Sequence, residues 1–404
     1  MTALQTPAAP TRVSRPGMRL TCTVIALTIV GYPLAGLVAS ALGLDSTVTS
    51  IPLRALVALV SALTVLHFVG AGHRFRLDWI ILLFWWLYLL RLVFDLGSGQ
   101  FEDVDIALLF FLATAMIPAL AVMVGARGYD EALTARMLFV LGAVICAGSV
   151  LIDVLGIGDT ASLTEVTGRL SFEVLNPITL GHVAATTLIA GLVLWRSPGL
   201  PGGRATLIAG AGAALACLLL AASRGPVLAL MVALISYSIL RGRWGRIFAG
   251  GLALLLIAPM ILATQGVELV ERFTNITSDL SARERLMIQG NALDQATASP
   301  IWGSAYTELV SGQYPHNLIL ESFMALGLVG LGLFVFICLR GGLQAAVRLR
   351  AGEVLLPLLL VQYFISAMFS GSIWGAGGLW VLLALLAVTS KGLFGETDRQ
   401  VQPA

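Results

Sequence analysis

Long apolar stretches recur along almost the whole chain, and short runs containing Gly, Pro and Arg separate them. Most of these stretches reach the roughly 20 residues that an α-helix needs to cross the hydrocarbon core of a bilayer. Hydrophobic side chains make up 58% of the 404 residues and charged ones only 11%, whereas a typical soluble domain carries about 25% charged residues. The sequence therefore predicts an all-α polytopic membrane protein and excludes an ordinary soluble fold.

About twelve transmembrane helices are expected. They fall at residues 20–43, 51–71, 79–96, 106–125, 137–158, 179–195, 205–222, 227–240, 247–264, 317–339, 354–371 and 374–390. The first is too long for the apolar core of a signal peptide, and no convincing small-residue cleavage site follows it. We therefore interpret it as a helix of the mature protein.

Basic residues predict the orientation, because loops rich in Lys and Arg stay in the cytoplasm. With the N-terminus inside, seventeen basic residues fall on the cytoplasmic side and five on the outer side. Both termini are therefore expected in the cytoplasm. The five outer residues, which run against this bias, are Arg169, Arg224, Arg272, Arg283 and Arg285.

One membrane domain is expected at 19–390, between a polar, disordered N-terminus at 1–18 and a cytoplasmic tail at 391–404. Two outer loops are longer than turns, at 159–178 and 265–316. Within the second, the run "SDLSARERLMIQGNALDQATASP" predicts a surface helix that starts near Ser278 or Asp279 and stops at Pro300. Loops of this length are uncommon unless they carry function, so we expect 265–316 to be functional.

The outer arginines indicate an anionic substrate, because the planar guanidinium binds a diphosphate through paired hydrogen bonds and stays charged. Arg224 lies in "AASRGPV", where Ser223, Gly225 and Pro226 predict a tight helix break.

Arg283 and Arg285 share the helix expected in the long loop, and two positions correspond to about 200° around its axis. Both cannot face the same way, and the sequence leaves open which one faces a site. Arg169, in "TGRLSFEVLNP", is a further candidate that a surface salt bridge explains equally well.

A histidine stands in "GQYPHNLILESFMALGLVGLG", at the start of the span predicted at 317–339. His316 follows Pro315 and precedes Asn317, and Glu321 lies one helical turn after Asn317. A neutral imidazole accepts a proton from a hydroxyl near pH 7, and a neighbouring carboxylate or carboxamide can orient it. His316 is therefore a candidate general base, although a single histidine also fits a structural role.

Charged residues inside the predicted spans, among them Arg54 and Asp153, are candidates for a proton or ion path. Arg91 and Asp95 are four residues apart on one helix face, so mutual neutralisation is the simpler explanation for them. The four cysteines have no metal-like spacing and no outward carboxylate cluster is apparent, so no metal site is expected. The net charge of +2 gives no case for nucleic acid as a partner.

Three motifs on the predicted outer side, taken in order, resemble those of the O-antigen ligase and O-antigen polymerase superfamily of bacterial envelope enzymes. They are "SRG" at a helix turn, "SARERL" followed by "PIWGSA" in the long loop, and "PHNLILESFMALGLVG" at the next span. The topology of the whole chain fits this resemblance. By position, Arg224 matches the arginine of the first motif, Arg283 the loop arginine, and His316 with Asn317 the histidine motif. Members often carry Trp four residues after the loop arginine, where this chain has Met287, so the choice between Arg283 and Arg285 stays open.

The resemblance implies an integral membrane glycosyltransferase of the bacterial inner membrane, with a GT-C-like helical architecture and its active site facing the periplasm. The implied donor is a glycan linked through a diphosphate to undecaprenol, and the implied acceptor is the lipid A core or a second lipid-linked glycan; membrane lipid is a further partner. Inverting, metal-independent transfer without a cofactor would use His316, Arg224 and Arg283 as catalytic residues. The residues expected to bind substrate are Arg285, Arg169, Asn317, Glu321 and Ser223.

Alternatives remain at this level. The sequence does not distinguish a ligase from a polymerase, and it does not identify the sugar, the linkage, the acceptor or the oligomeric state. A multi-span transporter or flippase of lipid-linked sugars also fits the number of spans, although transporters place polar groups near the membrane midplane in broken helices of matching halves. A purely structural subunit would leave the five outer arginines unexplained.

Overall fold

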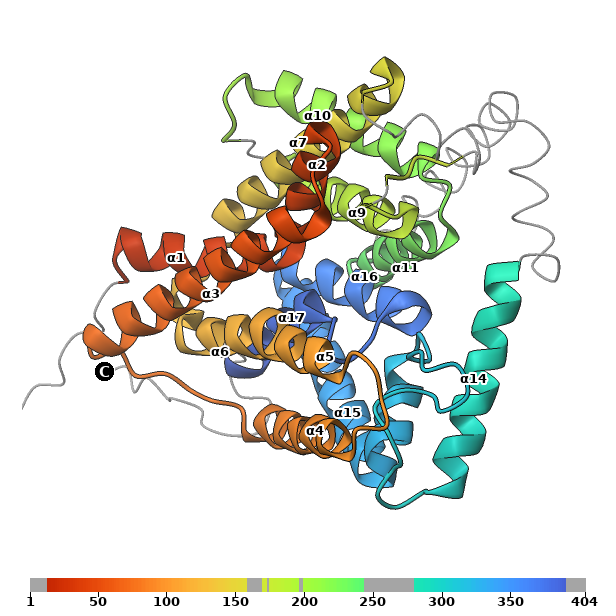
Figure 1. The fold of residues 1–404 in the computed structure, drawn as a ribbon. Helices are drawn as coiled ribbons and strands as arrows, with labels where there is room; N and C mark the ends of the chain where they lie inside the picture. Colours follow the sequence, from red (N-terminus) through yellow and green to blue (C-terminus); the bar gives the residue numbers. More distant parts are fainter. Residues whose placement is uncertain (1–12, 158–168, 173, 196–198, 243–279, 390–404) are drawn as a thin grey trace, which may run out of the picture.

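The computed structural model describes residues 13–157, 169–172, 174–195, 199–242 and 280–389, and this part of the chain is built from helices (Figure 1). Within it, eight helical stretches are long and apolar enough to cross a membrane, and three apolar helices are shorter. The prediction of an α-helical membrane protein is therefore confirmed. Eleven of the twelve predicted spans coincide with these helices. Eight of the eleven are long enough to cross a membrane and three are shorter. The remaining predicted span, 247–264, lies outside the described residues.

Residues 15–128 form four spans, two of which contain a π-helical segment. The elements are α1 (Arg15–Ala26), η1 (Leu27–Gly31), α2 (Tyr32–Leu42), α3 (Ser46–Gly70), α4 (Trp79–Ser98), α5 (Val104–Phe110), η2 (Phe111–Met116), α6 (Ile117–Val124) and the short η3 (Ala126–Gly128). Ser14 caps α1 by accepting a hydrogen bond from Gly17, and Pro16 suits the first turn. The prediction of disorder over residues 1–18 is therefore wrong for Arg15–Met18, which are helical. Residues 1–12 lie outside the described part of the chain.

The described residues from 131 to 389 contain seven apolar helices and one polar helix. They are α7 (Glu131–Leu155), α9 (Pro177–Leu194), α10 (Gly203–Leu220), α11 (Arg224–Leu240), α14 (Leu280–Ala298), α15 (Leu318–Ala351), α16 (Leu355–Ser370) and α17 (Gly377–Thr389). The polar one, α14, is the helix predicted in the long loop. It ends before Pro300 and lies at the edge of the bundle, where Ala292 and Ala296 pack against Met324 of α15 (Figure 1). The predicted start near Ser278 or Asp279 and the predicted tail at 391–404 lie outside the described residues.

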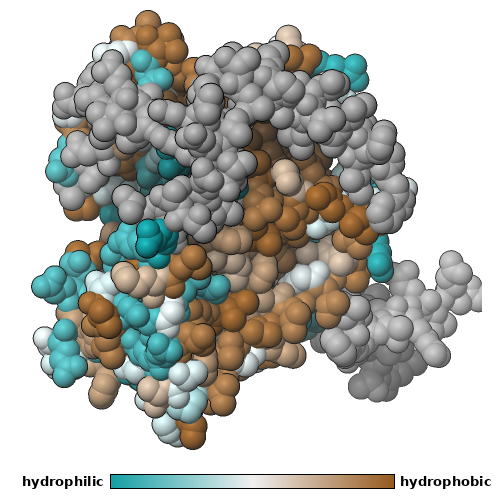
Figure 2. Space-filling model, turned by 90° about the vertical axis from the view of Figure 1, so that its right-hand side faces the viewer, coloured by the Kyte–Doolittle hydropathy of each residue, from teal (hydrophilic) through white to brown (hydrophobic). Residues whose placement is uncertain are grey.

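Large aromatic side chains fill the centre of the bundle. Phe84, Trp85 and Tyr88 of α4 are fully buried, and the rings of Phe84 and Trp85 contact Trp380 of α17 at 5.4 and 5.6 Å between centroids. Figure 2 shows the complementary outer surface, where hydrophobic side chains cover much of the face that is not hidden by grey atoms. Because lipid tails are themselves apolar, close packing of this kind holds membrane helices together.

Helix α15 is broken at Gly327, and the chain that follows α14 fills the break. Gly327 has φ 64° and ψ −158°, which interrupts the helical backbone. The Leu328 amide donates to the Pro300 carbonyl at 2.7 Å, and the Ser304 amide donates to the Met324 carbonyl at 2.9 Å. Peptide groups at membrane depth must find partners within the protein, so these bonds fix the loop against the helix.

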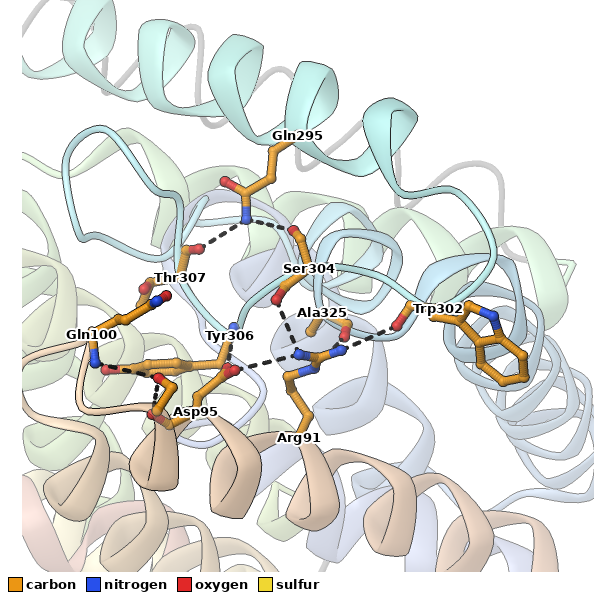
Figure 3. Close-up of polar contacts among 10 residues, drawn as sticks. Arg91, Asp95, Gln100, Gln295, Trp302, Ser304, Tyr306, Thr307 and Ala325 are labelled. Atoms are coloured by element: carbon orange, nitrogen blue, oxygen red, sulfur yellow. Dashed lines mark hydrogen bonds and ion pairs between the residues drawn. The ribbon is translucent and has the colours of Figure 1, made fainter.

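Arg91 of α4 holds the same loop from the other side (Figure 3). Its guanidinium donates to the carbonyl oxygens of Ala325 at 3.0 Å, Ser304 at 3.0 Å and Trp302 at 3.3 Å. It also pairs with Asp95 at 3.3 Å, so the predicted pair is confirmed. Five donor hydrogens on one planar group can satisfy several carbonyl oxygens that the helix break leaves free.

Asp95 and Gln295 complete the clamp on this loop. The second carboxylate oxygen of Asp95 accepts the Tyr306 amide at 2.9 Å. From α14, the Gln295 amide nitrogen donates to the Ser304 hydroxyl at 2.9 Å and to the Thr307 carbonyl at 3.1 Å (Figure 3). Side chains of two helices therefore fix the backbone of residues 302–307, which leads directly to His316.

Replacing Gly303 by Ala should destabilise the protein. A Cβ atom there would lie 2.4 Å from the Ala325 carbonyl carbon, and the residue has φ 70°. We expect a loss of about 2 kcal/mol or more, seen as a lower unfolding temperature in detergent. Gly290→Ala is the matched control on α14, because no atom lies within 4 Å of its added Cβ, and it should be neutral or slightly stabilising. Equal unfolding temperatures for both variants would contradict the tight contact at Gly303.

Candidate functional site

A cavity of about 490 Å³ lies among the helices, between two walls. One wall comes from the first span, α3 and the α5–η2 region, and includes Thr28, Arg54 and Phe110. The other comes from α9, α16, the segment before α17 and the outer loop. Both π-helical segments contribute, through Thr28 of η1 and Thr114 of η2. Single π-helical turns inside α-helices often occur at functional sites.

Two arginines and two histidines line this cavity together with many apolar side chains. They are Arg54, Arg285, His182 and His316, and no Asp or Glu lines the cavity among the residues that the structure describes. Cations that share a cavity with low-dielectric walls raise the local concentration of anions. The cavity is therefore electrostatically suited to an anionic ligand.

His316 is held at the lip of α15 by its neighbours in the chain. The Asn317 side chain caps α15 by accepting the amides of Ile319 at 3.1 Å and Leu320 at 3.2 Å. His316 itself has φ 55°, a left-handed conformation that a non-glycine residue adopts only when the surroundings enforce it. Its ring lies 4.4 Å from the ring of Tyr314, and its buried Nδ1 atom has no hydrogen-bond partner among the described residues.

Burial, followed by the positive charge of Arg285, lowers the pKa of His316 to about 4, while Glu284 acts in the opposite direction. The imidazole is consequently neutral near pH 7. A neutral ring with a free nitrogen can accept a proton, which is the property that general base catalysis requires.

Of the two loop arginines, Arg285 lines the cavity and Arg283 does not. Arg285 donates to the Phe369 carbonyl at 2.9 Å, near the end of α16. Arg283 is exposed. The expectation that the two side chains point in different directions is met, and the structure places the catalytic candidate Arg283 away from the cavity.

Arg224 and Ser223 lie at the predicted helix break between α10 and α11, which the structure confirms. Arg224 is the first residue of α11, and the preceding Ala222 has φ 45°. Arg169 belongs to the same region, because its Nε donates to the Ala221 carbonyl at 3.2 Å.

This turn lies beside the cavity wall. Pro226 contacts Gly181 of α9, whose neighbour His182 lines the cavity. Neither Arg224 nor Arg169 is itself a lining residue. The structure thus brings these two candidates together with each other, at a turn that packs against α9.

Glu321 does not contact His316. One of its carboxylate oxygens accepts the Tyr88 hydroxyl at 2.8 Å, and the other accepts the Ile373 amide at 2.9 Å. Glu321 is fully buried and joins α4 and α15 to the segment before α17. Its effect on the cavity is indirect, because Ile373 adjoins the lining residue Trp374.

No motif in the sequence marked His182 or Trp374 as a candidate. His182 Nε2 lies 2.7 Å from the Ser366 hydroxyl, whereas its Nδ1 and the Trp374 Nε1 are buried without a partner in the part of the chain that the structure describes. Buried polar atoms are normally hydrogen-bonded, so their presence around one cavity suggests contacts with a ligand. No local signal marked His182, because Ser366 lies 184 residues away in the chain.

Comparison with known proteins gives one match, to the family model described as O-antigen ligase, over residues 209–335. This segment runs from α10 through α11 and α14 into α15, and it contains Arg224, Arg285 and His316. No curated protein and no solved structure matches the chain. Over residues 209–335 the chain is similar to the O-antigen ligase family, and the resemblance noted in the sequence is confirmed for this segment.

Proposed function

We propose that the protein transfers a glycan from an undecaprenyl-diphosphate carrier to a hydroxyl group of an acceptor sugar, at the periplasmic face of the bacterial inner membrane. The acceptor is either the lipid A core, for a ligase, or a second lipid-linked glycan, for a polymerase. The family match supports an enzyme of this general type over a transporter or flippase.

The charge of the cavity is the observation that carries this proposal. Arg285 and His316 of the long loop line the same cavity as Arg54 and His182, and within the described ranges no carboxylate lines it. A glycosyl diphosphate needs positive charge at the diphosphate and a base near the acceptor hydroxyl. The arginines supply the first requirement and the neutral imidazole of His316 the second.

In the proposed reaction, the acceptor oxygen attacks the anomeric carbon while His316 takes the hydroxyl proton. The bond between the anomeric carbon and the diphosphate oxygen breaks on the opposite side, so that the configuration inverts and undecaprenyl diphosphate leaves. Arg285 stabilises the negative charge that grows on this leaving group, an interaction that is stronger in the transition state than in the ground state. Because arginine provides the compensating charge, the scheme calls for no metal ion.

Arg224 acts at the edge of the cavity in this scheme. It begins α11, where the helix dipole also favours a negative group. Together with Arg169, which is bonded to the same turn, it would attract the anionic part of the donor as the lipid carrier approaches. The backbone break at Ser223 sets the direction of the Arg224 side chain, and Asn317 holds His316 by capping α15.

His316→Ala should lower the rate of glycan transfer by about 10²- to 10⁴-fold, the range over which general base catalysis contributes. The assay uses purified protein in detergent with an undecaprenyl-diphosphate-linked glycan and a panel of acceptors. His73→Ala is the matched control, because His73 does not line the cavity, and it should retain activity. A His316→Ala protein that folds and transfers at the wild-type rate would exclude His316 as the base. Product size separates one-step ligation from the ladder of a polymerase.

Arg285→Gln should reduce kcat/KM by about tenfold or more, whereas Arg283→Gln should change it little. Both arginines lie on α14 and both are replaced by Gln, so the two variants differ mainly in whether the replaced side chain faces the cavity. Initial rates at varied donor concentration give the comparison. A larger loss in Arg283→Gln would reverse the assignment of the loop arginine.

Titration of His316 should cause no change in kcat/KM between about pH 6 and 8. The pKa of the folded imidazole is about 4, so its base form is lost only as the pH falls through that value. Arg285→Gln removes a charge that lowers this pKa, and the acidic limb should therefore move upward, toward the ordinary value near 6.5. Profiles of both proteins from pH 4.5 to 8 test this; a wild-type limb centred near pH 6.5 would contradict it.

A further inference from the structure

Arg54 lies on α3, far from the segment that the family model matches, and its side chain faces the same cavity as Arg285. Its Nη1 atom donates to the Ser50 hydroxyl at 3.1 Å, and its guanidinium lies 3.9 Å from the centre of the Phe110 ring. A second aromatic ring, that of Tyr32, lies at 6.0 Å. These contacts hold the planar group in place and leave most of its five donor hydrogens available.

The charge of Arg54 is not neutralised by a carboxylate among the residues that the structure describes. Arg91 offers the comparison within the same membrane domain, because it pairs with Asp95 and donates to three carbonyl oxygens. A charged side chain inside a membrane span is costly unless it is paired, reaches water or serves a function. Hydroxyl and aromatic contacts compensate a guanidinium only in part.

The surroundings of Arg54 combine a lipid-facing surface with the charged cavity. Ile51 and Leu56 on the same helix are exposed, as is usual for side chains that face lipid. Leu53 and Val57, on either side of Arg54 in the chain, line the cavity instead. Arg54 is thus placed where a ligand with an apolar tail in the bilayer would bring its anionic head into the cavity.

From this geometry we propose that Arg54 binds the diphosphate of the lipid-linked donor, from the wall formed by α3, while Arg285 binds it from the outer loop. The assignment rests on the proposed function for the identity of the lipid-linked diphosphate. Two guanidinium groups on separate elements would hold the leaving group between them and direct its sugar toward His316. Trp374, whose buried Nε1 has no partner within the described ranges, would add a further donor from the same cavity.

The test measures binding of undecaprenyl diphosphate, without glycan or acceptor, to the purified full-length protein in nanodiscs. Arg54→Gln should weaken binding by about tenfold or more, the effect of losing a charge-assisted contact. Arg54→Lys should weaken it less, since lysine keeps the charge but loses the planar fork. Arg283→Gln is the control and should bind as the wild type does.

A second arm uses soluble pyrophosphate to separate the two sources of the same anion. Weaker binding of pyrophosphate than of the lipid, with the same dependence on Arg54, supports a site for the lipid-linked form. Equal affinity for both would overturn the lipid-linked assignment. Folded Arg54→Gln protein that binds undecaprenyl diphosphate as tightly as the wild type would show that Arg54 only packs against Phe110. If Arg54→Gln unfolds, unchanged binding by folded Arg54→Lys overturns the proposed fork contact.

The outcomes for Arg54 and for the transferase reaction are distinguishable. Wild-type protein that binds undecaprenyl diphosphate through Arg54 but transfers no glycan to any acceptor would refute the reaction and keep the binding site. Wild-type protein that transfers glycan, with an unchanged donor KM in Arg54→Gln, would refute the Arg54 assignment and keep the reaction.

Discussion

The break in α15 imposes a requirement on the structure around it, because a membrane helix cannot leave its peptide groups without partners. At Gly327 the helix is interrupted, and groups of Met324, Ala325 and Leu328 bond instead to the loop after α14 or to Arg91. The loop is therefore part of the membrane domain rather than a cover laid over it. The same loop carries His316. The geometry of the cavity therefore depends on the hydrogen bonds that satisfy the peptide groups at this break.

Arg91 and Arg54 show two different solutions to a guanidinium inside a helix bundle. Arg91 has a structural role, since it binds one carboxylate and three backbone carbonyl oxygens. Arg54 touches a hydroxyl and two aromatic rings, and the described part of the chain supplies no carboxylate to the cavity that it faces. The distinction follows from the contacts alone, and it separates a residue that holds the fold from one that we assign to a ligand.

The cavity joins parts of the chain that the sequence motifs treat separately. The family match and the three motifs lie in the second half of the chain, but one wall of the cavity comes from the first span, α3 and η2. Glu321 illustrates the indirect role that a motif residue can have. It stands one turn into α15, yet it bonds to Tyr88 and to the Ile373 amide rather than to His316, and so it supports the wall instead of the imidazole.

Local patterns along the chain were enough to predict the membrane class, the positions of most helices, the helix in the long loop and the order of the motifs. Those features depend on local hydropathy, helix breakers and the spacing of neighbours along one helix, as for Arg91 with Asp95. Tertiary packing places Arg285 rather than Arg283 in the lining of the cavity, and it brings Arg54 and His182 into the same lining. These relations depend on the rotation of each helix about its axis and on packing between residues far apart in the chain, which no local pattern encodes.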